Sequence, residues 1–94
     1  MDLEWDEAKD AENRRKHGLP LAEAARLDWS LAVRNEDRRR DYGERRWTAT
    51  APLDGRLHVC AYTLRRGRMR IISLRRANPR ETRKYGHRTA PPDD

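Results

Sequence analysis

Phenylalanine is absent from this 94-residue sequence, and cysteine occurs only once, at Cys60. A single thiol cannot form an internal disulfide, and three scattered histidines give no recognised zinc spacing with it. The composition therefore excludes a disulfide scaffold and a zinc module, and we expect no metal and no cofactor. Because no catalytic partner motif accompanies Cys60, we expect its thiol to lie in the core.

Long apolar runs are absent too. None approaches the roughly 20 residues that cross a bilayer, and the first six residues carry acids where a signal peptide carries bases before an apolar stretch. These absences predict a cytoplasmic protein without a membrane partner.

Apolar side chains make up only 35% of the chain, and without phenylalanine the core has to be built around Trp5, Trp29 and Trp47. A chain of this length forms one small domain. We expect that domain over residues 1–86, followed by a disordered tail over residues 87–94. A core this thin fits a protein that is normally held by a partner.

Charged residues, in contrast, make up 40% of the chain and give a formal net charge of +6. The excess is local, because residues 1–33 hold 8 acids and 5 bases whereas residues 34–94 hold 8 acids and 17 bases. Of the 22 bases, 19 are arginine, the side chain that binds phosphate through two parallel hydrogen bonds. The charge predicts a nucleic acid or another polyanion as partner, with a solvated basic surface as the alternative.

The N-terminal third favours helices. Residues 3–5 indicate a short strand, Asp6 is suited to cap a helix over residues 7–17, and Gly18 ends that helix. Pro20 is well placed to start a second helix. The apolar face of this second helix would consist of Leu21, Ala24, Ala25 and Leu27.

The remainder favours strands. A strand signal over residues 31–34 is followed by an almost wholly charged stretch, residues 35–43, which we expect to be a connection. Three stronger strand signals then cover residues 46–51, 57–64 and 69–75, separated by two short turns that contain glycine. Neither face of the middle strand is purely polar, so helices are expected on one side and another contact on the other.

Alternation in the last of these strands assigns its side chains to two faces. One face would carry Arg70, Ile72 and Leu74. The other would carry Met69, Ile71, Ser73 and Arg75. One arginine is therefore expected on each face of the sheet.

A third helix is predicted after the last strand. Asn78 is suited to its N-cap, Pro79 to its first position and Glu81 to a reciprocal cap, and the helix is expected to end near Tyr85, before Gly86. The order of elements predicts an α+β fold with helices packed on an antiparallel sheet.

A set of short motifs runs through residues 4–85 in a fixed order. The motifs are Trp5-Asp6-x-x-Lys9, Asn13-x-x-Lys16-His17-Gly18, Gly43-Glu44-x-Arg46, Tyr62-Thr63, Arg70-Ile71-Ile72-Ser73-x-Arg75-x-Ala77, Glu81 and Tyr85. In this order and spacing the chain resembles the BrnT family of bacterial toxins. Leu21 and Ala51 depart from the family pattern without removing a chemically active group, and residues 35–42 have no confident alignment.

The resemblance implies a compact RelE-like domain, in which an antiparallel sheet packs with two N-terminal helices and a short C-terminal helix. It implies the toxin of a type II toxin–antitoxin system, a ribonuclease that inhibits translation and growth. It also implies a BrnA-type antitoxin as partner, with two toxins bound to an antitoxin dimer and the complex binding operator DNA. The other hypothesis is a non-catalytic basic RNA- or protein-binding module, that is, a degenerate toxin.

RNA cleavage without a metal needs a base for the 2′-hydroxyl, cations for the charge that builds on phosphorus, and a proton donor for the leaving oxygen. The sequence offers such residues without an acid cluster for magnesium, so a metal-independent endoribonuclease is expected. Arg75 is the first candidate for binding the phosphate and Arg46 the second. Either arginine is alternatively an ordinary surface side chain or an ion-pair partner of Glu44.

Three residues are candidates for proton transfer, each with a structural alternative. Glu44 lies next to arginines and suits a salt bridge, His17 suits the end of a helix, and Tyr85 suits packing on the sheet. Five further residues are candidates for binding RNA, or else form a polar surface. They are Lys9, Asn13 and Lys16 on one helix face, and Arg70 and Arg76.

Overall fold

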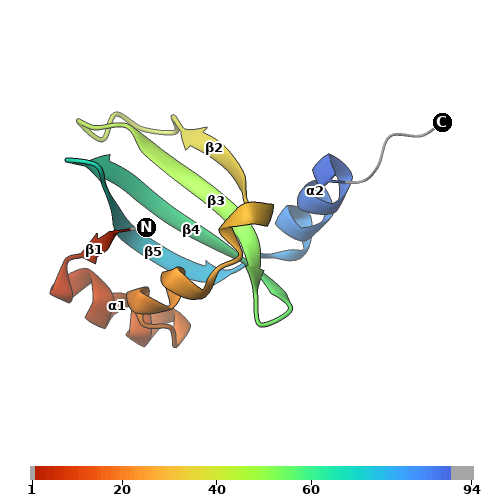
Figure 1. The fold of residues 1–94 in the computed structure, drawn as a ribbon, viewed down its shortest axis with the longest axis horizontal. Coiled ribbons are helices and arrows are strands. Elements are labelled where there is room, and N and C mark those ends of the chain that lie inside the picture. Colours follow the sequence, from red (N-terminus) through yellow and green to blue (C-terminus); the bar gives the residue numbers. More distant parts are fainter. Residues whose placement is uncertain (1, 90–94) are drawn as a thin grey trace.

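The computed structural model describes residues 2–89, which form one five-stranded sheet in the order β1-β5-β4-β3-β2 (Figure 1). The strands are β1 (Leu3–Trp5), β2 (Val33–Asp37), β3 (Arg46–Leu53), β4 (Arg56–Arg65) and β5 (Arg68–Arg76). All neighbours pair antiparallel except β1, which pairs parallel with β5 at one edge. The predicted α+β fold is confirmed, with a mixed sheet in place of a wholly antiparallel one.

The first helix, α1 (Glu7–His17), has the predicted ends. The Asp6 carboxylate accepts hydrogen bonds from the backbone amides of Ala8 and Lys9 at 2.8 and 3.2 Å, and Gly18 closes the helix with a φ of 71°. Few L side chains adopt this left-handed conformation, so glycine is the suitable residue there. Local capping thus defines both ends of α1.

The predicted second helix is a 3₁₀ helix, η1 (Leu21–Arg26), followed by a shorter one, η2 (Trp29–Leu31). With three residues per turn, Leu21, Ala24 and Leu27 fall on one line, and all three are buried. Ala25, which an α-helical period would bury, is exposed. The predicted apolar face is therefore correct except at Ala25.

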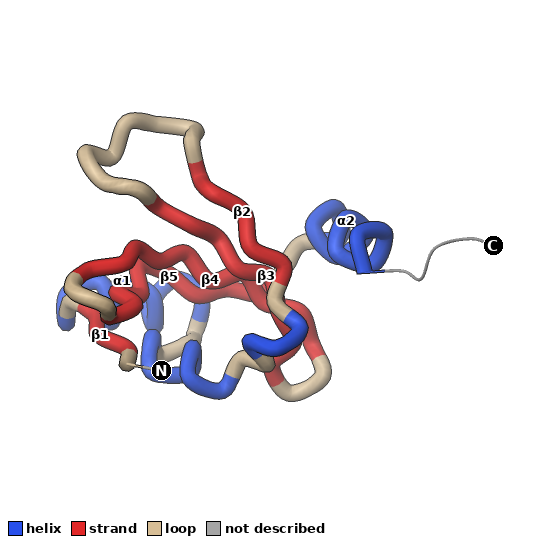
Figure 2. The backbone as a smooth tube through the Cα atoms, turned by 45° about the horizontal axis from the view of Figure 1, so that its top comes forward, coloured by secondary structure: helices blue, strands red, loops and turns tan. Residues whose placement is uncertain are grey.

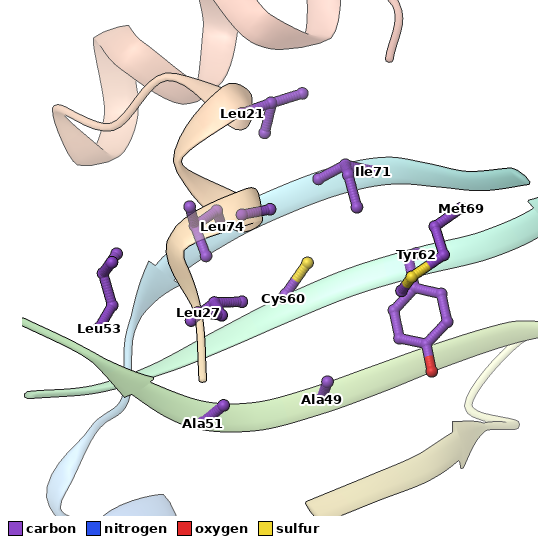
Figure 3. Packing of buried hydrophobic residues seen from close by; sticks show 11 residues of the cluster. Leu21, Leu27, Ala49, Ala51, Leu53, Cys60, Tyr62, Met69, Ile71 and Leu74 are labelled. Carbon is purple, nitrogen blue, oxygen red and sulfur yellow. The ribbon is translucent and has the colours of Figure 1, made fainter. Parts of the chain in front are cut away.

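The core lies between these helices and one face of the sheet. The small side chains Ala49, Ala51 and Cys60 of β3 and β4 lie in this core together with Leu21 and Leu27 (Figure 3), and η1 contacts the sheet mainly along β5. Burial raises the pKa of the Cys60 thiol to about 12, which agrees with its predicted place in the core. The three tryptophans pack around the rim of this cluster and are partly buried.

A β-bulge in β5 overturns the predicted division of its faces. Tyr62 pairs with Ile71 but Ala61 pairs with Ser73, so Ile72 is an extra residue. Beyond the bulge the alternation reverses, and the core receives Met69, Ile71 and Leu74. The opposite face receives Arg70, Ser73 and Arg75. The expectation of one arginine on each face was therefore wrong, and Arg70 and Arg75 share a face.

Two element boundaries also differ from the prediction. The edge strand β2 continues to Asp37, into the stretch expected to be a connection, because residues 33–37 pair with β3 throughout. The last helix, α2 (Pro79–Thr89), has the predicted reciprocal cap, in which the Asn78 amide donates to Glu81 at 2.9 Å and the Glu81 amide donates to Asn78 at 2.8 Å.

The helix then continues through Gly86 to Thr89 instead of ending near Tyr85. The rest of the predicted tail, residues 90–94, lies outside the described residues. No helix in the described part of the chain is long and apolar enough to cross a bilayer.

Candidate nucleic-acid interface on the open sheet face

The sheet face opposite α1 and the two 3₁₀ helices is polar, and we call it the open face. Residues that pair across β3, β4 and β5 form three successive rows on it. The rows are Arg46–Thr63–Arg70, Thr48–Ala61–Ser73 and Thr50–Val59–Arg75. Strand β2 adds Asn35 and Asp37, which pair with Thr48 and Arg46.

A groove of about 450 Å³ lies over one part of this face. The β2–β3 connection and α2 lie at opposite ends of β2 (Figure 2), and both contribute to the walls of the groove. Threonines and a valine form the floor, and arginines, acids and one lysine stand around it. The lining residues are Asn35, Glu36, Asp37, Arg38, Arg39, Thr48, Thr50, Val59, Arg75, Glu81 and Lys84.

Arg75, the first predicted phosphate ligand, lies in this groove. Its two terminal guanidinium nitrogens donate to the two carboxylate oxygens of Glu81 at 2.7 and 2.8 Å. The hydrogen bonds from Arg75 lower the pKa of the Glu81 carboxyl, and the same pairing raises the pKa of Arg75. Arg75 is thus a permanently charged group at the junction of β5 and α2.

Two groove residues from the β2–β3 region were missed by the sequence analysis. Arg39 donates to both oxygens of Asp37 at 2.9 Å each, and the Tyr42 hydroxyl donates to Asp37 at 3.0 Å. The hydrogen bonds from Arg39 hold the pKa of Asp37 far below its usual range. Across the groove, the positive charge of Arg39 opposes the rise in the pKa of Arg75, but the effect of Glu81 is larger. Residues 35–37 are Asn, Glu and Asp, and no local pattern marked them as part of a strand.

Lys84 is the third missed residue of the groove. It projects from α2 and is exposed, with no ion-pair partner among residues 2–89. Unlike Arg39 and Arg75, it is a cation of the groove wall that forms no ion pair with a described acid. Its place next to Tyr85 in the sequence gave no hint of this position, because α2 was expected to be a short helix at the end of the domain.

Arg46, the second predicted phosphate ligand, lies at the other end of the open face. Its guanidinium stacks on the Tyr42 ring at 4.1 Å and approaches Glu44 at 3.7 Å. The Nε of Arg46 is buried without a hydrogen-bond partner among the described residues. Four residues of strand, about 13 Å, separate its row from the row of Arg75. The structure therefore brings Arg46 and Arg75 to one face but not into contact.

The predicted RNA ligand Arg70 lies in the same row as Arg46 and donates to Glu4 of β1 at 2.8 Å. Arg76 pairs with His58 on the helix-covered side and is exposed at the end of β5. Arg76 is therefore on a different surface from Arg70.

The predicted proton-transfer groups are spread over three places. Glu44 lies within 3.9 Å of Arg65 as well as close to Arg46, so it has the salt-bridge contacts expected as its alternative. The Tyr85 hydroxyl donates to the Leu31 carbonyl at 2.8 Å and fastens α2 to η2. His17 is exposed at the end of α1, where it borders a groove with Ile72 and Ser73 of β5.

The predicted RNA ligands on α1 lie along the edge of β5. Lys9, Asn13, Lys16 and His17 border a small groove of about 260 Å³ with Ile72 and Ser73. Lys16 pairs with Glu12 at 2.8 Å. Lys9 and His17 are exposed there.

The Asn13 side chain is buried and bonded to backbone. Its amide nitrogen donates to the carbonyls of Leu19 and Leu74 at 2.7 and 2.9 Å, and its oxygen accepts from the Leu74 amide at 3.0 Å. These bonds replace a strand neighbour beyond the end of β1, where the backbone of β5 would otherwise be buried without partners.

Comparison with known proteins assigns the chain to a family. The family model described as "Ribonuclease toxin, BrnT, of type II toxin-antitoxin system" matches residues 5–81. The 1.1 Å crystal structure of the Brucella abortus ribonuclease toxin BrnT is similar with a TM-score of 0.62 and 23% identity, over 83% of this chain and 97% of that chain. No curated protein matches the chain.

At 23% identity the Brucella structure shows a common fold. The family model covers most of the chain, and it defines the class of protein as a toxin of type II toxin–antitoxin systems. The chain belongs to the BrnT family of ribonuclease toxins, as its motifs indicated.

Proposed function

We propose that the chain is an endoribonuclease that cleaves RNA on its open face without a metal ion, and so inhibits translation and growth. The observation that carries this proposal is the common face of Arg46, Arg70 and Arg75, which the bulge at Ile72 creates. Membership of a family of ribonuclease toxins supports the reaction class. A basic face lined with threonines suits a phosphodiester backbone.

In the proposed reaction the 2′-hydroxyl oxygen attacks the adjacent phosphorus. A new O2′–P bond forms, the P–O5′ bond breaks, and a proton passes to the departing 5′-oxygen, which leaves a 2′,3′-cyclic phosphate. Arg75 is the proposed phosphate ligand, since its forked donors match two non-bridging oxygens. The phosphate then shares or replaces the contact between Arg75 and Glu81.

Proton transfer is proposed for groups beside Arg75. Glu81 is ionised at neutral pH, as its lowered pKa requires, and it can accept the proton of the 2′-hydroxyl once a phosphate engages Arg75. Lys84 lines the same groove as a cation and can protonate the leaving oxygen. Tyr85 borders an adjoining cavity together with Lys84, which makes it the nearest of the groups predicted from sequence.

The other residues predicted to act in catalysis, Arg46, Glu44 and His17, lie farther from this groove, and a part in the reaction stays a proposal for each of them. Arg46 and Arg70 are proposed to bind another phosphate of the same RNA strand, about 13 Å along the sheet from the row of Arg75. Lys9, Asn13, Lys16, Arg76 and His17 belong to surfaces that a longer RNA would have to reach around an edge of the sheet.

Independence from metals is proposed from the chemistry of the donors. Asp37 and Glu81, two of the three acids that line the groove, each bind an arginine through both carboxylate oxygens. A magnesium ion would have to displace these arginines. Cleavage of a labelled RNA in the presence of excess chelator tests the point, and loss of activity restored by added magnesium contradicts it.

A BrnA-type antitoxin is the proposed inhibitor, with two toxins on an antitoxin dimer and the assembly bound to operator DNA. The uncovered open face supports this proposal, because a partner seated on it would exclude RNA. Co-expression of the antitoxin should restore growth, and the mass of the purified complex gives the stoichiometry. A protein that binds RNA with no cleavage at any concentration would indicate a degenerate toxin instead.

A further inference from the structure

Three arginines surround the tip of the β4–β5 hairpin, and we call Arg65, Arg66 and Arg68 the arginine tip. With Glu4 they border a hollow of about 700 Å³ that is separate from the groove at Arg75. Resting on the proposed function, we propose that the arginine tip is a second RNA-binding site, which holds backbone phosphates far from the scissile bond.

The arginine tip continues the open face. Arg65 pairs with Arg68, two residues along each strand from the pair Thr63–Arg70. Both arginines are therefore on the same face of the sheet as the row Arg46–Thr63–Arg70. Six residues of β4 separate Arg65 from Val59, the neighbour of Arg75, a span of about 20 Å. A single strand of RNA that enters the groove can therefore follow one face of the sheet to the arginine tip.

The positive charge of the arginine tip is available to bind a ligand. Residues 64–70 contain four arginines and no acid. Within the described part of the chain, Arg66 and Arg68 form no ion pair, and Arg65 is 3.9 Å from Glu44. The one acid of the hollow, Glu4, is already engaged by Arg70 at 2.8 Å. Phosphate would thus meet unneutralised guanidinium groups.

The backbone of Arg66 has a conformation that its residue type rarely adopts. The two hairpins of the sheet have turns with positive φ at both central residues, Asp54-Gly55 and Arg66-Gly67. Such turns favour asparagine, aspartate or glycine at the first central position. Asp54 follows this preference, whereas Arg66 adopts a φ of 52° against it. The β4–β5 turn therefore has a conformationally unfavourable residue at the position where it carries a positive charge, which is consistent with a function for that charge.

RNA is preferred over a protein partner because of the track between the two sites. Arg46, Arg70 and the threonines of the open face lie between the arginine tip and the groove, so one ligand can contact all of them. An extended polyanion fits this line of cations, with contacts to the backbone and not to a particular base.

The test compares two double variants, each of which loses two positive charges. Arg66→Asn with Arg68→Gln changes the arginine tip, and Arg15→Gln with Arg56→Gln removes exposed charges elsewhere on the chain. RNA affinity is measured by fluorescence anisotropy against salt, and cleavage is measured on a long RNA and on a dinucleotide that spans only the groove.

In the arginine-tip variant, the slope of the logarithm of the long-RNA binding constant against the logarithm of the salt concentration should become less steep by about 1.4, or 0.7 per lost phosphate contact. The proposal also predicts about a tenfold rise in KM for long RNA, with kcat unchanged and with dinucleotide cleavage unchanged. The control variant should move none of these values. Because asparagine suits the position of Arg66, the arginine-tip variant should unfold at the same or a higher denaturant concentration.

Other outcomes overturn the proposal. An equal loss on long RNA and dinucleotide assigns the arginine tip to the fold or to the chemistry. Unchanged RNA affinity together with loss of neutralisation by the antitoxin assigns it to the protein partner. If the unaltered protein binds RNA but cleaves neither substrate, the proposed function fails, and the anisotropy comparison still decides whether the arginine tip binds RNA.

Discussion

Arg75 of β5 and Glu81 of α2 form a bidentate ion pair, with nitrogen–oxygen distances of 2.7 and 2.8 Å. Glu81 also accepts the Asn78 amide in the reciprocal cap of α2. One carboxylate therefore joins the sheet to the helix and holds the arginine proposed to bind phosphate. This contact therefore contributes both to the stability of the fold and to the proposed phosphate site. Substitution of Glu81 should mainly affect stability, whereas substitution of Arg75 should mainly affect cleavage.

The first prediction concerns stability. Glu81→Gln should lower the free energy of unfolding by about 1 kcal/mol, since the pair is about one-third exposed and its attraction is reduced by solvent. Urea denaturation followed by circular dichroism measures this loss. Glu12→Gln, which breaks the exposed pair with Lys16 on α1, is the matched control and should cost less. Equal losses in both variants would contradict the account of α2.

The second prediction concerns pH. The pKa of Glu81 is lowered in the folded state by Arg75. The contribution of the ionised Glu81 to folding stability is therefore fully present above the usual glutamate pKa of about 4.3. That contribution is lost as the pH falls through the lowered value. Asp37, held by Arg39, behaves in the same way. Stability should thus decline on acidification, and the decline should be smaller in Glu81→Gln; identical pH profiles would refute the linkage.

The third prediction separates the two roles open to Asn13. Asn13→Ala leaves the amide and carbonyl of Leu74 without their side-chain partners in a buried place, so the free energy of unfolding should fall by about 3 kcal/mol. Lys16→Ala, one turn further on α1, should have a far smaller effect. A variant Asn13→Ala of normal stability that no longer binds RNA would instead support the predicted role of Asn13 as an RNA ligand.

The ends of α1 and the start of α2 were predictable because they depend on residues next to one another in the sequence. Asp6, Gly18 and the Asn78–Glu81 pair each satisfy backbone groups within a few residues. The two hairpin turns were predictable for the same reason. By contrast, the end of α2 had no local signal, since Gly86 continues the helix although glycine usually ends one.

The bulge at Ile72 and the extent of β2 were not predictable from local pattern. A run of alternating residues does not show where a strand gains an extra residue, because the partner strand decides this. Likewise, the charges of β2 hid a strand whose pairing with β3 is a long-range contact. The arginines of the open face could be named from sequence, but the groove partners Arg39 and Lys84 required the fold.

The fourth prediction concerns the thiol. Burial raises the pKa of Cys60 to about 12, and the side chain is fully enclosed, so a thiol reagent should not modify the native protein at neutral pH. Modification should follow the fraction unfolded across a urea titration. Rapid stoichiometric labelling in the absence of denaturant would contradict the burial of Cys60 in the core.

The central claim is that Arg75 contributes its guanidinium to RNA cleavage on the open face. The most direct measurement compares cleavage of one labelled RNA, in excess chelator, by Arg75→Gln and Glu81→Gln at a temperature where both are folded. Both variants break the same ion pair, but only the first removes the guanidinium.

Arg75→Gln should lower kcat a hundredfold or more. Glu81→Gln, which keeps Arg75, should retain phosphate binding with an unchanged KM, and loses only the part of kcat that depends on its carboxylate. Full activity of Arg75→Gln would contradict the account, and so would complete dependence of the unaltered protein on added metal.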